Sequence, residues 1–419
     1  MNFSDLPIAQ SRLARVLRGG GFDELAKRLA RKAYMATRAS ALDFPLRRED
    51  ITDSTSVRRS APPSYWTSAP AMTVGWICAP PGPGSGGHTT MFRMIEALEA
   101  VGHTCVLYLY DPHGVDLAKY TVIVRRHWPQ VRADVRDIDD GLRGTDAIVA
   151  TSWQTAHVLG SRPTAPGTRF YFVQDYEPYF YPRGSEYALA EDTYRFGFEI
   201  LALGTMVHDE ILANTGVQST LVPFGCDTEV YRPANKSTRS GVAFYSRPDT
   251  ARRGSILAGL ALDLFHAQRP EVTIHLVGPR PLIMSAPALE HSHLEPRELA
   301  ELYNTTVCGI GMSFTNISLV VAEMLACGTI PVVNDSAMAR ADLTHPSVSW
   351  VTPTPVAIAE RLCELVDSSP DVVQSRAAAA AAGHRGWAGS TAALVRAVDI
   401  GVRMTPPPEK LSRTEESAW

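Results

Sequence analysis

The chain has 419 residues, with 40 Lys and Arg against 44 Asp and Glu, and 45% of its residues are apolar. Because about 150 residues per domain is usual, this length predicts two to three globular domains. A net charge of −4 gives too weak a field to hold a polyanion, which argues against nucleic acid as a partner.

The first 20 residues carry scattered charges and no apolar core, so we expect no secretory signal, and no apolar run is long enough to predict a membrane span. The cysteines are far apart and form no CxxC pair: Cys78, Cys105, Cys226, Cys308, Cys327 and Cys363. This usage indicates reduced core residues of a cytoplasmic protein and neither a disulfide framework nor a zinc site.

Residues 1–60 hold twelve Lys and Arg against seven Asp and Glu. Apolar residues recur there at helical spacing between the basic ones, at Leu13, Val16, Leu17, Leu25, Leu29 and Tyr34. Such an arm either packs on its own domain with solvated charges, the favoured interpretation, or lies on an anionic membrane surface through residues 1–40. With the Ser-, Thr- and Pro-rich stretch 51–71, it forms a predicted basic helical extension and linker over 1–71.

From residue 72 the pattern predicts strands alternating with helices. The strands are expected at 73–78, 104–110, 146–150, 169–173 and 199–203, and the helices at 89–101, 154–160, 186–197 and 205–214. Such alternation is typical of a parallel sheet covered by helices, here an N-terminal domain over 72–225.

The alternation restarts beyond a connection near 222–240. It predicts strands at 241–246, 272–277, 307–311 and 330–333, with helices at 254–268, 296–303 and 318–327. We therefore expect an α/β protein with two doubly wound, Rossmann-like domains facing across a cleft, the second over 226–386. Residues 405–419, which include three consecutive prolines, are expected to be a disordered tail.

A glycine loop, GPGSGG at 82–87, follows the first strand and opens a helix. With Asp111 ending the next strand, it admits a dinucleotide-binding interpretation, although Pro83 removes one backbone donor. It equally fits a loop facing a sugar-phosphate ligand across the cleft, or close strand–helix packing alone. His88, directly after the loop, either contacts the ligand or caps the helix.

Cations and a helix start occur at strand ends of the second domain. Arg247 ends a strand, and Arg252 and Arg253 precede a helix, where guanidinium groups can pair with phosphate or form only an exposed basic turn. Asn316 to Ser318 place backbone N–H groups at the start of the next helix, and Glu323 lies on that helix as a ribose ligand or a buried glutamate. Together these features fit a nucleotide diphosphate.

The segment from Phe172 to Phe198 surrounds Gln174, Asp175 and Glu177 with aromatic residues, a composition that suits carbohydrate. Some of these aromatic residues must belong to the hydrophobic core.

Asp137 and Asp139 have a spacing that could hold a metal, but a solvated loop is the favoured interpretation. No GxSxG, HExxH or GxxxxGK[ST] motif occurs, which argues against the common hydrolases, zinc proteases and P-loop enzymes.

In this order and spacing, five segments resemble the family 4 retaining glycosyltransferases of GT-B fold, and most closely the WsaF-type rhamnosyltransferases of bacterial surface-glycan assembly. The segments are GPGSGGHTTMFRMIEAL, FVQDYEPYFYPRGSEYALAEDTYRFG, PFGCDTEVYRP, SRPDTARRG and SFTNISLVVAEMLACGTIPVV. The resemblance covers about residues 72–400, and it implies that a final helix, 387–404, crosses back to the first domain.

The resemblance also implies the site. The second domain would bind the donor, taken as dTDP-β-L-rhamnose, and the first would bind a glycan or lipid-linked glycan acceptor, with no metal and no cofactor. The implied donor-binding residues are Gly86, Gly87, Arg247, Arg253, Thr315, Asn316, Ile317, Ser318 and Glu323. The candidate acceptor-binding residues, taken from the glycine loop and the aromatic segment, are His88, Gln174, Asp175, Tyr176 and Glu177. Thr315 departs from the family, which has a glutamate there that contacts the transferred sugar.

The implied mechanism is retention by front-face attack, with Arg247 and Arg253 stabilising the leaving diphosphate. Asp175 is our hypothesis for the residue that orients the acceptor hydroxyl. The implied setting is polysaccharide synthesis at the cytoplasmic face of the membrane. Two other functions stay open: an NAD-linked oxidoreductase or sugar-nucleotide epimerase, and a non-catalytic carbohydrate-binding protein of the same fold.

Overall fold

The computed structural model describes residues 26–59, 71–234 and 238–404, and these divide into two compact units between residues 48 and 49. In the first unit, a helix over residues 26–36, here called the N-terminal helix, has every side chain exposed, and the 3₁₀ helix η2 spans Ala39–Asp43. The predicted apolar positions before residue 26, most of the linker and the tail lie outside the described residues. None of the described helices has the length and apolar character needed to span a membrane.

The 3₁₀ helix η3 (Arg48–Asp50) spans the boundary, and the second unit contains α2 (Ser54–Arg59) and then a seven-stranded parallel sheet. Its strands are β1 (Thr73–Cys78), β2 (Thr104–Leu109), β3 (Asp134–Asp137), β4 (Ala147–Ala150), β5 (Thr168–Val173), β6 (Glu199–Leu203) and β7 (Thr220–Val222). The connecting helices are α3 (Gly86–Ala100), α4 (Leu117–His127), α5 (Trp153–Gly160), α6 (Ser185–Thr193) and α7 (Thr205–Thr215). The spatial order is β3-β2-β1-β4-β5-β6-β7.

A second parallel sheet of six strands follows, in the equivalent order β10-β9-β8-β11-β12-β13. Its strands are β8 (Val242–Tyr245), β9 (Ile274–Val277), β10 (Leu289–His291), β11 (Cys308–Ile310), β12 (Ile330–Asn334) and β13 (Ser349–Val351). Its helices are α8 (Ser255–Gln268), α9 (Pro296–Thr305), α10 (Leu319–Cys327), α11 (Ala337–Ala341), α12 (Pro355–Val366) and α13 (Pro370–Ala380).

The strand order decides where ligands can bind. In each sheet the winding reverses beside the first strand, between β1 and β4 and between β8 and β11. Loops at the carboxyl ends of strands flanking such a switch point form the binding crevice of doubly wound folds. The glycine loop follows β1, and the Arg247 loop and the turn over residues 313–318 follow β8 and β11, so all three lie at switch points.

Local sequence explains why these elements form. The central strands are continuous apolar runs, as a sheet covered on both faces requires, and Trp76 and Phe172 are fully buried. Asp116 caps α4 by accepting from the Lys119 N–H, and Ser152 starts α5 with a capping box.

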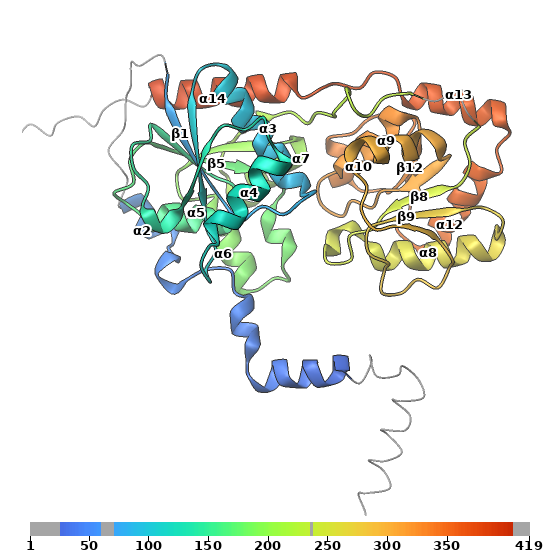
Figure 1. Cartoon of the computed structure of the whole chain (residues 1–419), viewed down its shortest axis with the longest axis horizontal. Coiled ribbons are helices and arrows are strands. Elements are labelled where there is room, and N and C mark those ends of the chain that lie inside the picture. The colour runs from blue at the N-terminus through green and yellow to red at the C-terminus, as the bar shows by residue number, and fades with distance from the viewer. Residues whose placement is uncertain (1–25, 60–70, 235–237, 405–419) are drawn as a thin grey trace, which may run out of the picture. The chain divides into compact units, whose positions relative to one another are not determined.

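The last helix, α14 (Ala388–Met404), returns to the first domain, where it packs against α3 and β7 (Figure 1). Leu394, Val398 and Val402 are buried in the core of that domain, together with Trp387. Gly401 lies against Phe170 so closely that a Cβ there would come within 2.6 Å of the ring. The chain therefore crosses between the domains twice.

The two crossings lie side by side and are bonded to each other. The Cys226 N–H donates to the Arg385 carbonyl at 2.9 Å, and a Cβ on Gly225 would lie 2.8 Å from the Trp387 Cα. Arg93 of α3 holds both crossings, because it pairs with Asp227 at 2.7 Å and lies over the Trp387 ring at 5.4 Å. We call this cluster the double crossing.

Sequence and structure agree on the predicted strands and helices of both sheets to within a few residues. The sequence analysis missed the outer strands β3, β7, β10 and β13 and the helices α4, α11, α12 and α13. The missed strands are three or four residues long and carry polar side chains, so they lack the apolar runs that mark the central strands.

Candidate active site

The glycine loop is held from within by His88. Its Nδ1 lies 2.7 Å from the Ser85 hydroxyl and its Nε2 lies 3.0 Å from the Ala79 carbonyl. Because a carbonyl only accepts, Nε2 carries the proton and Nδ1 accepts from Ser85, which describes a neutral ring. Burial lowers the pKa of His88, which agrees with this state. Both ring nitrogens are thus used inside the loop rather than offered to a ligand.

Gly86 and Gly87 open α3 and are exposed. A Cβ on Gly86 would meet nothing within 4 Å, so the space beside its Cα is open. The Gln174 amide donates to the Gly87 carbonyl at 3.0 Å and so joins the loop to the segment after β5. These placements leave the start of α3 accessible to an anion.

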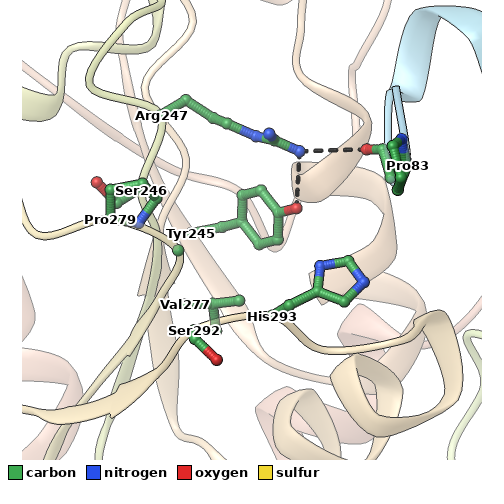
Figure 2. A pocket seen from close by; sticks show the side chains of 10 residues that line it. Pro83, Tyr245, Ser246, Arg247, Val277, Pro279, Ser292 and His293 are labelled. Atoms are coloured by element: carbon green, nitrogen blue, oxygen red, sulfur yellow. Dashed lines mark hydrogen bonds between the residues drawn. The ribbon is translucent and has the colours of Figure 1, made fainter. Parts of the chain in front are cut away.

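Arg247 reaches from the end of β8 to the glycine loop. Its guanidinium donates to the Tyr245 hydroxyl at 2.8 Å and to the Gly84 carbonyl at 3.3 Å (Figure 2). The pocket around it has a cavity volume of about 80 Å³ and is lined by Pro83, Gly84, Tyr245, Ser246, Arg247, Val277, Gly278, Pro279, Ser292 and His293. Small-molecule sites usually enclose about 300–1,000 Å³, so a nucleotide needs this pocket to open further.

Arg253 is more buried than Arg247, and it fixes the turn before α10. It donates to the Asn316 carbonyl and to its side-chain oxygen, both at 3.0 Å. Burial lowers the pKa of Arg253 to about 10, so the group stays charged at neutral pH. The Asn316 amide in turn donates to the Gln174 carbonyl at 2.6 Å. This chain of bonds joins the start of α8, the start of α10 and the first domain.

Ser318 is the N-cap residue of α10 and is partly exposed, whereas the Ile317 side chain is buried in the core of the second domain. Only the backbone of Ile317 can therefore meet a ligand. Glu323 is half-buried one turn further along α10, and burial raises its pKa to about 7 against the opposing charge of Arg93. It lies near the double crossing rather than at the helix start.

Asp175 is 4% exposed, and both of its oxygens are occupied. The Thr315 hydroxyl donates to Oδ2 at 2.9 Å, Arg252 Nε lies 3.0 Å from the same oxygen, and the Tyr176 N–H donates to Oδ1 at 2.9 Å. Two of these partners belong to the second domain. The structure therefore brings Asp175 and Thr315 together, residues 140 positions apart in the chain.

Tyr176 and Glu177 are interior residues. The Tyr176 hydroxyl donates to Glu191 at 3.1 Å, and Glu177 accepts from the Tyr171 hydroxyl at 3.0 Å and from the Trp153 N–H. Burial raises the pKa of Glu177 to about 8. Both side chains are buried and bonded inside the first domain beside Asp175, whereas the sequence predicted that they contact the acceptor.

Sequence reasoning missed Tyr245, Arg93 and the ion pair of Arg252 with Asp175. Tyr245 could have been found, since it lies two residues before Arg247 on the same strand end.

Asp137 caps a 3₁₀ turn by accepting from the Asp139 N–H at 2.9 Å, and no group of three or more metal-ligating side chains occurs among the described residues.

Two segments of the chain, one in each domain, match family models. Residues 132–205 match the model of the WsaF N-terminal domain, and residues 240–363 match that of the WsaF C-terminal domain. The O-antigen biosynthesis protein RfbC of Myxococcus xanthus is 31% identical over 237 residues, which are 54% of this chain and 18% of that protein. The chain therefore spans less than a fifth of this curated relative.

Solved structures of low sequence identity share the fold. WaaG, a glycosyltransferase involved in lipopolysaccharide biosynthesis, matches with a TM-score of 0.56 and 15% identity over 78% of this chain and 99% of its own. HepE of Anabaena, solved in complex with UDP, matches with a TM-score of 0.57 and 13% sequence identity. The match covers 78% of this chain and 100% of HepE. A protein of Listeria monocytogenes assigned as a UDP-N-acetylglucosamine 2-epimerase matches with a TM-score of 0.53 and 11% sequence identity. The match covers 81% of this chain and 98% of that protein.

Two doubly wound domains joined by a double crossing, with binding loops at the switch points, define the GT-B fold. Within that fold, the chain is similar to the WsaF-type glycosyltransferases over residues 132–205 and 240–363.

Proposed function

We propose that the chain is a retaining glycosyltransferase that moves L-rhamnose from dTDP-β-L-rhamnose to a glycan or lipid-linked glycan acceptor in cell-surface polysaccharide synthesis. The observation that carries the proposal is the convergence of Arg247, the exposed start of α3 and the Arg253-braced start of α10 at neighbouring switch points. Such a set of cations and helix N-termini suits a diphosphate.

In the proposed reaction, the bond from the sugar C1 to the diphosphate oxygen breaks, and its electron pair stays on the leaving phosphate. The acceptor oxygen bonds to C1 from the same side, and its proton passes to that phosphate oxygen. Arg247 and Arg253 stabilise the developing charge, and no metal is required by this scheme. Gly86, Gly87 and the backbone of residues 315–318 bind the phosphates, and Glu323 accepts from the ribose.

Asp175 is proposed to orient the acceptor hydroxyl. In this structure its carboxylate is bonded to Thr315 and Arg252, so this role requires these contacts to open as substrates enter. Asp175→Asn removes the charge and keeps the shape. Unchanged turnover of the variant would remove Asp175 from the mechanism.

Thermal shift with dTDP, UDP, GDP and NAD tests the donor, because a ligand that binds only the folded state raises the melting temperature. We expect a shift with dTDP that Arg247→Ala abolishes. A shift with UDP or GDP instead would keep the transferase and discard rhamnose. A shift with NAD alone would favour an oxidoreductase, and UDP-sugar interconversion without an acceptor would favour an epimerase.

The proposed location is the cytoplasmic face of the plasma membrane. The supporting observation is the N-terminal helix, in which Lys27, Arg31 and Lys32 accompany Leu29 and Met35, and Leu29 is 58% exposed. A basic helix with exposed apolar side chains suits an anionic lipid surface.

A further inference from the structure

Two phenylalanines, one from each domain, are exposed beside Asp175. Phe180 is 38% exposed and Phe314 is 41% exposed. Among the Phe, Tyr and Trp residues described between residues 49 and 404, these are the two exposed ones, and the others are buried or half-buried. Large aromatic side chains usually bury most of their surface, so a pair of them at one place calls for a binding role.

Arg252 joins these two residues. Its guanidinium lies 4.1 Å from the centroid of the Phe180 ring, and its carbonyl accepts from the Phe314 N–H at 3.1 Å. The Phe314 ring packs over the start of α8, where a Cβ on Gly254 would come within 2.9 Å of it. The Phe180 ring therefore lies against the guanidinium that pairs with Asp175, and Phe314 is joined to the same arginine through its backbone.

The polar groups at this place have the chemistry of sugar recognition. The carboxylate of Asp175 accepts hydroxyl protons, the hydroxyl of Thr315 donates or accepts, and Arg252 donates. Aromatic faces bury the C–H surfaces of a sugar ring while such groups bind its hydroxyls. Without a ligand, the Arg252 guanidinium covers the Phe180 face, which a sugar ring would otherwise meet.

We propose that Phe180, Phe314 and Arg252 form a saccharide subsite between the domains that binds the acceptor sugar, a role that rests on the proposed function. The acceptor is favoured over the donor sugar because Phe180 lies on the same segment as Asp175, and the pocket around Arg247 is lined by neither ring. Binding displaces the guanidinium from the Phe180 ring, and the sugar takes its place.

The test measures binding of methyl α-L-rhamnopyranoside and methyl α-D-glucopyranoside by saturation-transfer NMR, with dTDP present. We expect at least one glycoside to bind the wild type, and Phe180→Ala and Phe314→Ala to weaken it about 2- to 10-fold. Phe180→Tyr should retain binding and Phe180→Leu should not, because the flat face is required. Leu282→Ala, at a side chain 84% exposed, is the matched control.

Two readouts separate this inference from the proposed function. Binding of dTDP alone should be the same in the wild type and in every variant. If the wild type itself does not bind dTDP, the proposed donor is overturned and the subsite is not. Equal glycoside binding by the wild type and both alanine variants, or no binding of either glycoside, would overturn the subsite. Weaker binding of dTDP-β-L-rhamnose but not of dTDP in Phe180→Ala and Phe314→Ala would reassign it to the donor sugar and overturn the acceptor role.

Discussion

Glu177 should make the stability of this protein fall as pH rises. Burial raises its pKa from 4.5 to about 8 in the folded state, so the folded protein binds a proton that the unfolded chain releases above pH 4.5. The stabilisation by the protonated form is complete below pH 4.5 and is lost as pH rises to about 8. At 1.36 kcal/mol per pKa unit, the loss is on the order of 5 kcal/mol.

Glu177→Gln tests this reasoning, because glutamine keeps an acceptor for the Tyr171 hydroxyl and the Trp153 N–H and cannot ionise. The assay is urea unfolding followed by tryptophan fluorescence at pH 5, 6, 7, 8 and 9. We expect the variant to gain stability relative to the wild type as pH rises, with the gain levelling off above pH 8. Glu96→Gln, at an exposed position on α3, is the matched control.

A wild-type-to-variant difference that stays constant from pH 5 to pH 9 would refute the reasoning. Such a result would mean that Glu177 ionises at the same pH in the folded and unfolded chains, and that the hydrogen bonds it accepts offset its burial.

Three further predictions concern other parts of the chain. Gly204→Ala should lower the free energy of unfolding, measured by urea titration, by at least about 2 kcal/mol, because φ is +93° and the new Cβ would lie 2.4 Å from the Phe224 ring. Gly389→Ala is the control and should not lower it, since a Cβ there would meet nothing within 4 Å. The six cysteines are buried free thiols and should react with Ellman's reagent only after denaturation; fast reaction of the native protein would contradict their placement. In flotation assays the full chain should bind vesicles containing anionic lipid and not neutral ones, and Lys27→Glu with Lys32→Glu should weaken that binding; equal binding of both vesicle types would exclude the electrostatic contact.

The central strands could be predicted because burial on both faces leaves a direct mark on the sequence. Runs such as that of β1 admit few other interpretations. The edge strand β3, with the sequence DVRD, is half-solvated and looked like a charged loop. Only its pairing with β2 makes it a strand, and pairing depends on the tertiary fold rather than on local composition.

The site could be predicted one domain at a time, but the contacts between the domains could not. Residue types at strand ends indicated Arg247 and Arg253, because each follows from the position of a cation within its own domain. No local pattern relates Asp175 to Thr315, since that bond depends on how two separate domains face each other. Glu177 shows the reverse error, because a carboxylate beside aromatic residues suggested a ligand contact, while the fold buries it.

The double crossing restricts how the two substrates can meet. Two adjacent connections, bonded to each other and held by Arg93, leave the two domains less freedom to rotate against each other than a single connection would. Any relative movement of the domains would then return the loops at the two switch points to similar positions.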